Sequence, residues 1–388
     1  MNERISVAKP YIGEAERAYV SECLEKGDIS SNGYFVSRFE EINKTFYSVS
    51  YCIAVSNGTA ALHLAGLALG WKKRDVVLTS PISFLSSSNC ILYSGATPDF
   101  VDIDKSSYNI EINKLETKIK KLKLSSKKVV AIIATDYAGN PCDWKELRNI
   151  ASKYNIKLIN DNCHAIGASY YNDKSYAAKY ADIVTHSYHP VKNITTGEGG
   201  SILTRHKKIY DKINILRSHG TLKNSKLMFS NAGPWYYEMH EMGFNYRITD
   251  IQCALGISQL RKINKFIRRR KEIAKIYDEE FSEKDIFKIP KVEKNYSHAY
   301  HLYPLQINFD KKDQKRRLFH KLYKNKIKLQ VHYIPIHLQP YYRKNFGFKK
   351  GDFPVAESFY EREVSLPIYF SLKTKEIYKI INKIKSFF

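Results

Sequence analysis

The residue type and the sequence setting of Lys192 make it the first candidate for a catalytic residue. Lys192 lies in "HSYHPVKNITTGEGG" (186–200), a stretch of small, polar and glycine residues that follows an apolar run. Most lysines are solvated surface residues, and taken alone the stretch favours that interpretation. An amine placed inside a ligand site can instead form a Schiff base with a carbonyl group. The rest of the chain has to decide between the two.

Other polar residues stand where apolar strands are predicted to end. Asp161 ends "KLIND", and Ser187 ends "ADIVTHS". Gly58 and Thr59 follow "CIAV" and open a helix, where free backbone N–H groups favour an anion such as phosphate. Each residue has an ordinary structural alternative, because Ser, Asp and Thr also cap helices and turns. Phe84, in "SPISFLSSSN", offers a flat apolar face after another strand.

Taken together, these residues meet the requirements of one cofactor, pyridoxal phosphate. Lys192 supplies an amine for the aldehyde, and Asp161 supplies a carboxylate that keeps the pyridine nitrogen protonated. Gly58, Thr59 and Ser187 form an anion cradle, while the ring of Phe84 can stack on the cofactor. The order of these residues along the chain therefore predicts a pyridoxal phosphate site.

The elements that must position these residues belong to the α/β class. Between residues 50 and 205, short apolar runs alternate with helical patterns, which predicts a mostly parallel central sheet with helices on both faces. Ligands of such sheets bind at the carboxyl ends of the strands, where the polar residues above are expected. We predict a large cofactor-binding domain over residues 1–250.

The pattern changes after a glycine- and aromatic-rich stretch near residues 220–250. Helical patterns near 249–282 and 311–325 flank predicted strands at 300–308 and 329–336. This arrangement predicts a smaller α+β C-terminal domain over residues 251–388.

Composition argues against several other classes of protein. No apolar run approaches the roughly 20 residues that span a bilayer, and no signal peptide is recognisable, so we expect a cytoplasmic protein without membrane contact. The net charge of +24 is high, but the basic cluster 261–271 alternates with apolar residues at helical spacing. We therefore expect no nucleic-acid partner, although a nucleic-acid-binding regulator is the alternative from another class. The six cysteines contain no C-x-x-C pair, so we expect no metal site and no disulfide framework.

Several longer strings resemble the DegT/DnrJ/EryC1/StrS family of sugar aminotransferases over nearly the whole chain. The family's "SGTAAL" corresponds to "SNGTAAL" (56–62), and its "EDAAHALGA" to "NDNCHAIGA" (160–168). Its "FSF-x-x-x-K" corresponds to "HSYHPVK" (186–192), and its "G-x-N-x-R" followed by "IQAALG" to "GFNYRITDIQCALG" (243–256). The resemblance implies the fold type I architecture of pyridoxal phosphate enzymes and an aminotransferase activity.

Within this family, a further set of strings is similar to the branch that aminates carbon 4 in pseudaminic acid synthesis. These strings are "DYAGNPCDW" (136–144), "HPVKNITTGEGG" (189–200), "LRSHG" (216–220), "GPWYYEMHEMGFNYR" (233–247) and "VHYIPIH" (331–337). The resemblance implies L-glutamate as the amino donor and UDP-2-acetamido-2,6-dideoxy-β-L-arabino-hex-4-ulose as the acceptor. The product would be UDP-4-amino-4,6-dideoxy-N-acetyl-β-L-altrosamine.

The resemblance also implies roles for individual residues. Lys192 would carry the cofactor and then move a proton, Asp161 would pair with the pyridine nitrogen, and His164 would lie near the ring hydroxyl or else be a structural core histidine. Asn245 would reach a phosphate across a dimer interface, so the active unit would be a homodimer with shared sites. Residues implied to contact the nucleotide sugar are Gly27, Asp28, Ile29, Ser30, Gln330, Val331, His332, Tyr333 and, with a structural alternative, His337.

The chain departs from the family pattern at three places. Asn160 replaces a Glu, Asn57 replaces a small residue, and His186 with Tyr188 replaces a pair of aromatic residues.

Two alternatives within the family stay open beside the nucleic-acid-binding regulator. One is a relative acting on the epimeric D-xylo keto sugar or on another nucleotide keto sugar. A dehydratase-type relative would carry a histidine in place of Lys192, so the lysine argues against it.

Overall fold

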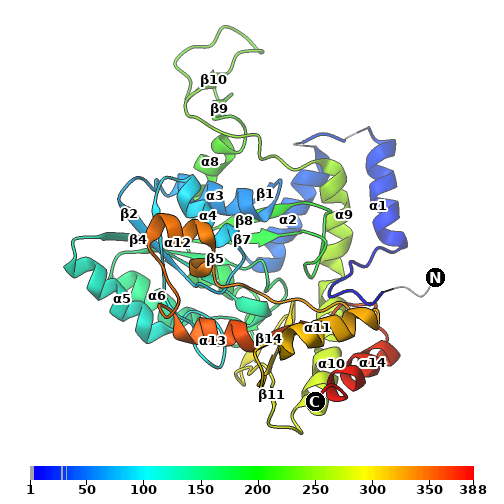
Figure 1. Cartoon of the computed structure of the whole chain (residues 1–388). Helices are drawn as coiled ribbons and strands as arrows, with labels where there is room; N and C mark the ends of the chain where they lie inside the picture. Colours follow the sequence, from blue (N-terminus) through cyan, green and yellow to red (C-terminus); the bar gives the residue numbers. More distant parts are fainter. Residues whose placement is uncertain (1–3, 28, 32) are drawn as a thin grey trace.

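The structure, a computed structural model, describes residues 4–27, 29–31 and 33–388. Its centre is a seven-stranded sheet with the order β1-β8-β7-β5-β4-β2-β3 (Figure 1). Only β8 runs antiparallel to its neighbours β1 and β7, so the expected α/β class with a mostly parallel sheet is confirmed. The strands are β1 (Tyr51–Val55), β2 (Asp75–Thr79), β3 (Thr97–Phe100), β4 (Lys128–Thr135), β5 (Lys157–Asp161), β7 (Ile183–Ser187) and β8 (Gly200–Thr204).

Both faces of this sheet are buried, because helices pack on each of them. Successive side chains of a strand therefore enter different cores, since they point to opposite faces. In β1, Cys52 and Ala54 enter one core, whereas Ile53 and Val55 enter the other. Helices α2, α5, α6 and α9 contribute to the first core and α3, α4 and α8 to the second. The helices of this part are α1 (Glu14–Glu25), α2 (Tyr34–Tyr47), α3 (Gly58–Ala68), α4 (Ser86–Tyr93), α5 (Ile112–Leu124), α6 (Trp144–Lys153), α7 (Tyr176–Tyr180), α8 (Lys207–Leu216) and α9 (Asp250–Arg261).

A separate core lies in the C-terminal part of the chain. Three helices, α10, α11 and α14, bury apolar residues against a three-stranded sheet of order β11-β13-β14. These strands are β11 (Phe287–Lys288), β13 (Tyr303–Ile307) and β14 (Glu363–Leu366). The remaining helices are α10 (Ile263–Phe281), η1 (Tyr137–Gly139), α11 (Gln314–Lys324), η2 (Ile336–Leu338), α12 (Pro340–Phe346), α13 (Pro354–Arg362) and α14 (Thr374–Lys385).

The two parts are joined by more than the connection between α9 and α10. The first turns of α10 belong to the large core, because Ile263 and Phe266 are buried there, whereas Tyr277 and Phe281 belong to the C-terminal core. Helices α12 and α13 pack in a further cluster that includes Phe100 of β3. The domain boundary at residues 250–251 stays a prediction.

Two expectations for the C-terminal half need correction. The predicted strand 329–336 is wrong, because this segment makes a single bridge, Gln330 to Ser365, and then turns into η2. The helical pattern 249–282 is two helices, since α9 ends at Arg261 and α10 begins at Ile263. Pro335, which has no N–H to donate to a strand, limits pairing along the first of these segments.

A long arm leaves the body of the molecule between α8 and α9. It carries the short pair β9 (Thr221–Leu222) and β10 (Glu238–Met239) and extends away from the central sheet (Figure 1). Strands β6 (Ser169–Tyr170) and β12 (Tyr296–Ser297) form another short pair. Within the described ranges, no helix combines the length and apolar character needed to cross a membrane.

Candidate active site

A cavity of about 790 Å³ opens where the carboxyl ends of β5 and β7 meet the start of α3. The C-terminal segments 301–302 and 328–333 close its other side. The structure therefore brings residues from distant parts of the sequence into one lining. The predicted site residues found in this lining are Gly58, Thr59, Phe84, Asp161, His164, Ser187, Lys192, Gln330, His332 and Tyr333.

Lys192 lies in the loop between β7 and β8, and its backbone N–H donates to the His189 carbonyl over 2.8 Å. Its side chain is half-buried and makes no ion pair or hydrogen bond with any residue that the structure describes. Burial lowers the pKa of the Lys192 amine, and the nearby Cys163 and Asp161 only partly oppose that shift. A desolvated, unpaired lysine is easier to deprotonate, so Lys192 is suited to act as a nucleophile and a base.

Asp161 occupies the last position of β5 and is 4% exposed. Its carboxylate accepts a hydrogen bond of 2.6 Å from Ser87 Oγ and one of 3.3 Å from the Cys163 N–H. A buried carboxylate held by neutral donors keeps its negative charge available for a cation in the cavity. The protonated nitrogen of a pyridine ring is a cation of this kind.

The N-terminus of α3 forms an anion cradle. Asn57 caps this helix, because its Oδ1 accepts a hydrogen bond of 2.8 Å from the Ala60 N–H. Among the described residues no acceptor is found for the Gly58 and Thr59 N–H groups, which border the cavity together with Ser187. A Cβ atom on Gly58 would lie 2.8 Å from Ser187 Cβ, so this close approach requires glycine. The departure at Asn57 thus provides the helix cap and leaves the cradle intact.

His164 is buried and forms a pair with Tyr333. Its Nδ1 accepts a hydrogen bond of 3.3 Å from the Ala138 N–H, and its Nε2 lies 3.0 Å from Tyr333 Oη. Burial, with repulsion from Lys192 and His332, holds the pKa of His164 well below its usual range. The ring is therefore neutral, and since Nδ1 is the acceptor, Nε2 carries the proton and donates to the phenol.

That hydrogen bond leaves the Tyr333 hydroxyl proton free to donate into the cavity. Burial raises the pKa of Tyr333, so the phenol keeps its proton. Phe84 lies beside this group, with its ring centroid 6.1 Å from that of Tyr333 and half of its surface exposed. The two rings offer a flat apolar boundary on which an aromatic cofactor can stack.

The departure at Asn160 has a structural reason. Asp136, which is fully buried, accepts hydrogen bonds from Asn162 Nδ2 over 2.9 Å, from Tyr176 Oη over 2.7 Å and from Asn160 Nδ2 over 3.3 Å. A glutamate at position 160 would place a second carboxylate against Asp136. The amide at this position therefore suits a network whose centre is the Asp136 carboxylate.

The departure at His186 belongs to the same network. His186 Nε2 lies 3.2 Å from Asn162 Oδ1, and its Nδ1 lies 3.1 Å from Ser201 Oγ. Tyr188 Oη lies 2.7 Å from the same Ser201 hydroxyl. Burial lowers the pKa of His186 to about 3, so the imidazole is a neutral member of the core beneath the site.

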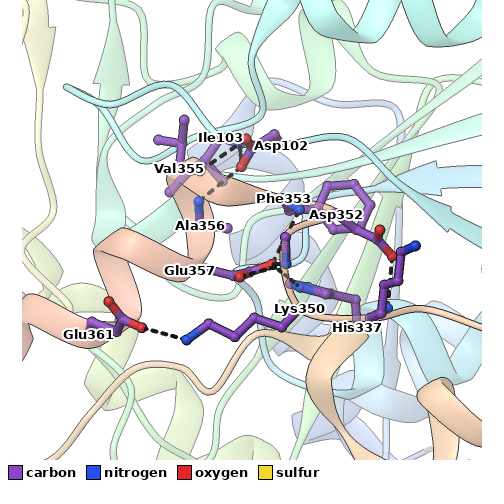
Figure 2. Close-up of polar contacts among 12 residues, drawn as sticks. Asp102, Ile103, His337, Lys350, Asp352, Phe353, Val355, Ala356, Glu357 and Glu361 are labelled. Atoms are coloured by element: carbon purple, nitrogen blue, oxygen red, sulfur yellow. Dashed lines mark hydrogen bonds and ion pairs between the residues drawn. The ribbon is translucent and has the colours of Figure 1, made fainter.

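His337 lies outside the cavity lining. Its side chain is fully buried, and Nε2 lies 2.9 Å from Glu357 Oε1 (Figure 2). The same carboxylate accepts N–H groups of the loop before α13, while Asp102 accepts the N–H groups of Val355 and Ala356 at the start of that helix (Figure 2). The structural alternative for His337 therefore has a direct explanation here, because it anchors α13.

Other predicted residues are also separate from the cavity in this single chain. Ser30 is anchored to α9, since the Asp250 N–H donates to the Ser30 carbonyl over 2.6 Å. Asn245 is exposed at the base of the arm, and Val331 is half-buried outside the lining. Asp28 lies outside the described residues.

Sequence reasoning missed several lining residues. Ser6, Val7 and Ala8 reach the cavity because Ile5 pairs with the segment 326–328, an interaction between distant segments that no local pattern indicates. Lys328 also lies at the cavity, and the alternation Lys328, Gln330, His332 is a signal that could have found it. His301 is a further missed residue.

The fold and this donor set define a class of enzyme. An unpaired amine, a buried carboxylate, an anion cradle and a flat apolar boundary fit pyridoxal phosphate, and they lie at the strand ends of a fold type I sheet. The model of the DegT/DnrJ/EryC1/StrS aminotransferase family matches residues 10–385. The chain belongs to this family and is a pyridoxal phosphate-dependent nucleotide-sugar aminotransferase.

Individual relatives cover the chain almost completely. It is 42% identical over 378 residues to the uncharacterized protein MJ1066 of Methanocaldococcus jannaschii, covering 97% of this chain and 96% of that protein. It is 37% identical to the UDP-4-amino-4,6-dideoxy-N-acetyl-β-L-altrosamine transaminase of Campylobacter jejuni, covering 93% of each chain. Among solved structures, Helicobacter pylori PseC, an aminotransferase of pseudaminic acid biosynthesis, matches with a TM-score of 0.89 at 29% identity over 100% of this chain and 99% of PseC.

Proposed function

We propose that this enzyme transfers the amino group of L-glutamate to carbon 4 of UDP-2-acetamido-2,6-dideoxy-β-L-arabino-hex-4-ulose. The product is UDP-4-amino-4,6-dideoxy-N-acetyl-β-L-altrosamine, an intermediate of pseudaminic acid synthesis. The observation that carries the proposal is the unpaired amine of Lys192 beside Asp161 in a cavity of about 790 Å³. The choice of sugar is supported by the C. jejuni relative, which is 37% identical and named for this product.

Lys192 performs the proton transfers in this mechanism. When bound, pyridoxal phosphate supplies the aldehyde that holds the migrating amino group and the ring that accepts electrons. The Lys192 amine removes a proton from the α-carbon of glutamate and later delivers one to carbon 4 of the sugar. Its lowered pKa suits this alternation, because a base with a pKa nearer neutrality both accepts and releases protons.

The other residues hold the reacting groups in place. We propose that Asp161 pairs with the pyridinium nitrogen and that Gly58, Thr59 and Ser187 bind the cofactor phosphate. Tyr333 is oriented by its hydrogen bond with His164, and its hydroxyl group donates a hydrogen bond to an oxygen of the cofactor ring or of the sugar. The hydrogen bonds that orient Asp161 and Tyr333 exist before the substrate arrives, so little reorganisation of these two side chains is required.

We propose that the nucleotide part of the substrate lies at the mouth of the cavity. Lys328 is exposed there and has no ion-pair partner among the described residues, so it can bind a diphosphate. Gln330 and His332 lie on the same side. Gly27, Ile29, Ser30 and the backbone of Val331 would complete the substrate contacts.

We further propose that the active unit is a homodimer that shares its sites. Asn245 does not line the cavity of its own chain. It forms a bridge with Ser218, where the chain leaves α8 and enters the arm. The arm extends from the body (Figure 1). Large apolar side chains of the arm are exposed, including Phe229 at 94%, Trp235 at 74% and Met242 at 77%. Exposed apolar surface of this kind is typical of an interface. A second chain would cover it and receive Asn245.

The test is amination of purified keto sugars. The enzyme is incubated with pyridoxal phosphate, L-glutamate and either the L-arabino or the D-xylo UDP-4-keto-6-deoxy-N-acetylhexosamine, and products are followed by mass spectrometry. We expect amination mainly of the L-arabino sugar. Preference for the D-xylo epimer would refute the proposed substrate. Lys192→Ala, as control, is expected to aminate neither sugar.

A further inference from the structure

The two ring nitrogens of His332 differ in their surroundings, because Nδ1 contacts the buried Ser365 hydroxyl and Nε2 is available to a ligand in the cavity. His332 lines the cavity, and its Nδ1 lies 2.8 Å from Ser365 Oγ on β14. No described residue makes a hydrogen bond with its Nε2. Burial lowers the pKa of His332 to about 4, so the imidazole is neutral and carries one proton near neutral pH. Whether Nε2 donates or accepts depends on where that proton resides.

The Ser365 hydroxyl connects His332 to a buried carboxyl group. Glu363 lies two residues earlier on β14, so both side chains are on the same face of the strand. Ser365 Oγ is in a short hydrogen bond with Glu363 Oε1, and Glu363 Oε2 accepts the His332 backbone N–H over 2.9 Å. The side chains of Glu363 and Ser365 are fully buried. Glu363, Ser365 and His332 thus form a relay of three groups that ends at the cavity.

This relay has two self-consistent proton arrangements. When Glu363 is ionised it accepts the Ser365 hydroxyl proton, Ser365 accepts from His332 Nδ1–H, and Nε2 is an acceptor. When Glu363 is protonated it donates to Ser365, whose hydroxyl donates to His332 Nδ1, and Nε2 then carries the proton. One proton gained at Glu363 therefore converts the cavity-facing nitrogen from an acceptor into a donor.

We propose that Glu363 is a positioning residue that, through Ser365, sets whether His332 Nε2 donates or accepts a hydrogen bond to the substrate. The inference rests on the proposed function only in taking the substrate to be a sugar nucleotide, whose hydroxyl and carbonyl groups require different partners. Glu363 itself touches no substrate, because it is enclosed by protein.

The surroundings of Glu363 allow both proton states to exist. Lys315 of α11 is the cation that faces Glu363 and favours its ionisation, whereas burial raises the pKa of Glu363 to about 8. Burial also lowers the pKa of Lys315 to about 8, so the two groups titrate as a pair. The phenols of Tyr108, Tyr137 and Tyr333 also face this carboxylate, and they are neutral because burial raises their pKa values. Among the described residues, no other carboxylate faces Glu363.

The test reads the proton on His332 directly. Protein labelled with ¹⁵N-histidine is titrated between about pH 6 and pH 10, and the His332 signals are assigned by their loss in His332→Gln. In the wild-type enzyme we expect Nε2 to change from protonated to unprotonated with a midpoint near the Glu363 pKa of about 8. In Glu363→Gln the carbonyl oxygen is needed as acceptor for the His332 backbone N–H, so the NH2 group faces Ser365 and donates to it. Nε2 should then stay protonated throughout. A wild-type Nε2 that does not change, or a change that Glu363→Gln retains, would overturn the proposal.

Two further variants separate this effect from a general loss of structure. Ser365→Ala removes the connection but leaves the carboxyl group, so the His332 proton should no longer follow pH. Glu361→Gln is the matched control, because Glu361 is exposed on α13 and pairs with Lys350 (Figure 2). It should reproduce the wild-type titration, and a flattened titration in this control would overturn the assignment to Glu363.

Binding of the UDP keto sugar adds a functional measurement. Gain or loss of one neutral hydrogen bond should change the dissociation constant about three- to tenfold across this pH range in the wild type. The change should be absent in Glu363→Gln. An intact His332 titration without binding of this sugar would refute the proposed substrate and leave the relay supported. Binding that is independent of pH in both proteins would overturn the role of the relay in recognition.

Discussion

Substitution of Gly58 by alanine is the sharpest perturbation of the cofactor cradle. The new Cβ atom would lie 2.8 Å from Ser187 Cβ and 3.3 Å from Ser187 Cα. Since Ser187 ends β7 and its backbone is held by β8, the strand cannot move away easily. The start of α3 must shift instead, and with it the N–H groups of Gly58 and Thr59 that face the cavity.

The size of the effect follows from the hydrogen bonds at risk. A hydrogen bond to a charged group contributes about 1.5–3 kcal/mol, so misplacing one N–H against the phosphate should weaken cofactor binding about 10- to 150-fold. Overpacking should also lower the free energy of unfolding by about 1–3 kcal/mol. Cofactor affinity is measured by absorbance titration of the apoenzyme, and stability is measured separately by thermal unfolding. We expect a clear loss of affinity even at temperatures where the variant is fully folded.

Gly256→Ala provides a matched control for overpacking. A Cβ on Gly256 would lie 2.8 Å from both Phe39 and Thr196, a clash as close as that at Gly58 but away from the cavity. We expect this variant to lose stability while keeping wild-type cofactor affinity. If Gly58→Ala binds the cofactor as tightly as the wild type, or if Gly256→Ala weakens binding equally, the cradle is not where the structure indicates.

Three other predictions follow from the buried network, the proposed dimer and Glu363. Asn160→Glu places a carboxylate beside buried Asp136 and should lower the unfolding free energy by about 2–4 kcal/mol in urea titrations; wild-type stability would contradict this role of the amide. Mixing inactive Asn245→Ala and Lys192→Ala chains should restore roughly a quarter of wild-type activity, since half of the dimers would hold one complete site; no recovery would contradict shared sites. Because the Glu363 pKa is raised from 4.5 to about 8, the folded state holds this proton more tightly, and stability from this group falls as pH rises between those values. Glu363→Gln should show a smaller loss of unfolding free energy from about pH 5 to pH 8, and an equal loss in both proteins would refute the assignment.

The sequence predicted the central sheet and the cofactor residues because both depend on local patterns. Strand and helix periodicity is repeated in every βα unit, and polar residues such as Asp161 and Ser187 stand where strands end. Since parallel strands align their carboxyl ends, the residues at these ends meet without further information. The gathering of Gly58, Asp161, Ser187 and Lys192 around one cavity could therefore be predicted.

The rest of the site depends on contacts between distant segments, which periodicity does not encode. Residues 329–336 alternate like a strand, yet His332 is held by Ser365 and Tyr333 by His164, so the segment pairs with β14 at a single bridge. A histidine such as His337 is a common ligand-binding residue, so the sequence suggested a substrate contact. Its structural role depends on Glu357, which is 20 residues away in α13. Such partners become visible only when the C-terminal segments are folded over the sheet.

The identity of the cofactor-bearing amine is the most direct test of this account. The enzyme loaded with pyridoxal phosphate is reduced with borohydride, digested and mapped by mass spectrometry, which locates the lysine that has become permanently attached to the cofactor. We predict that the modified residue is Lys192 and that no other lysine is labelled to a comparable extent. Labelling of a different lysine, with Lys192 recovered unmodified, would contradict the site described above.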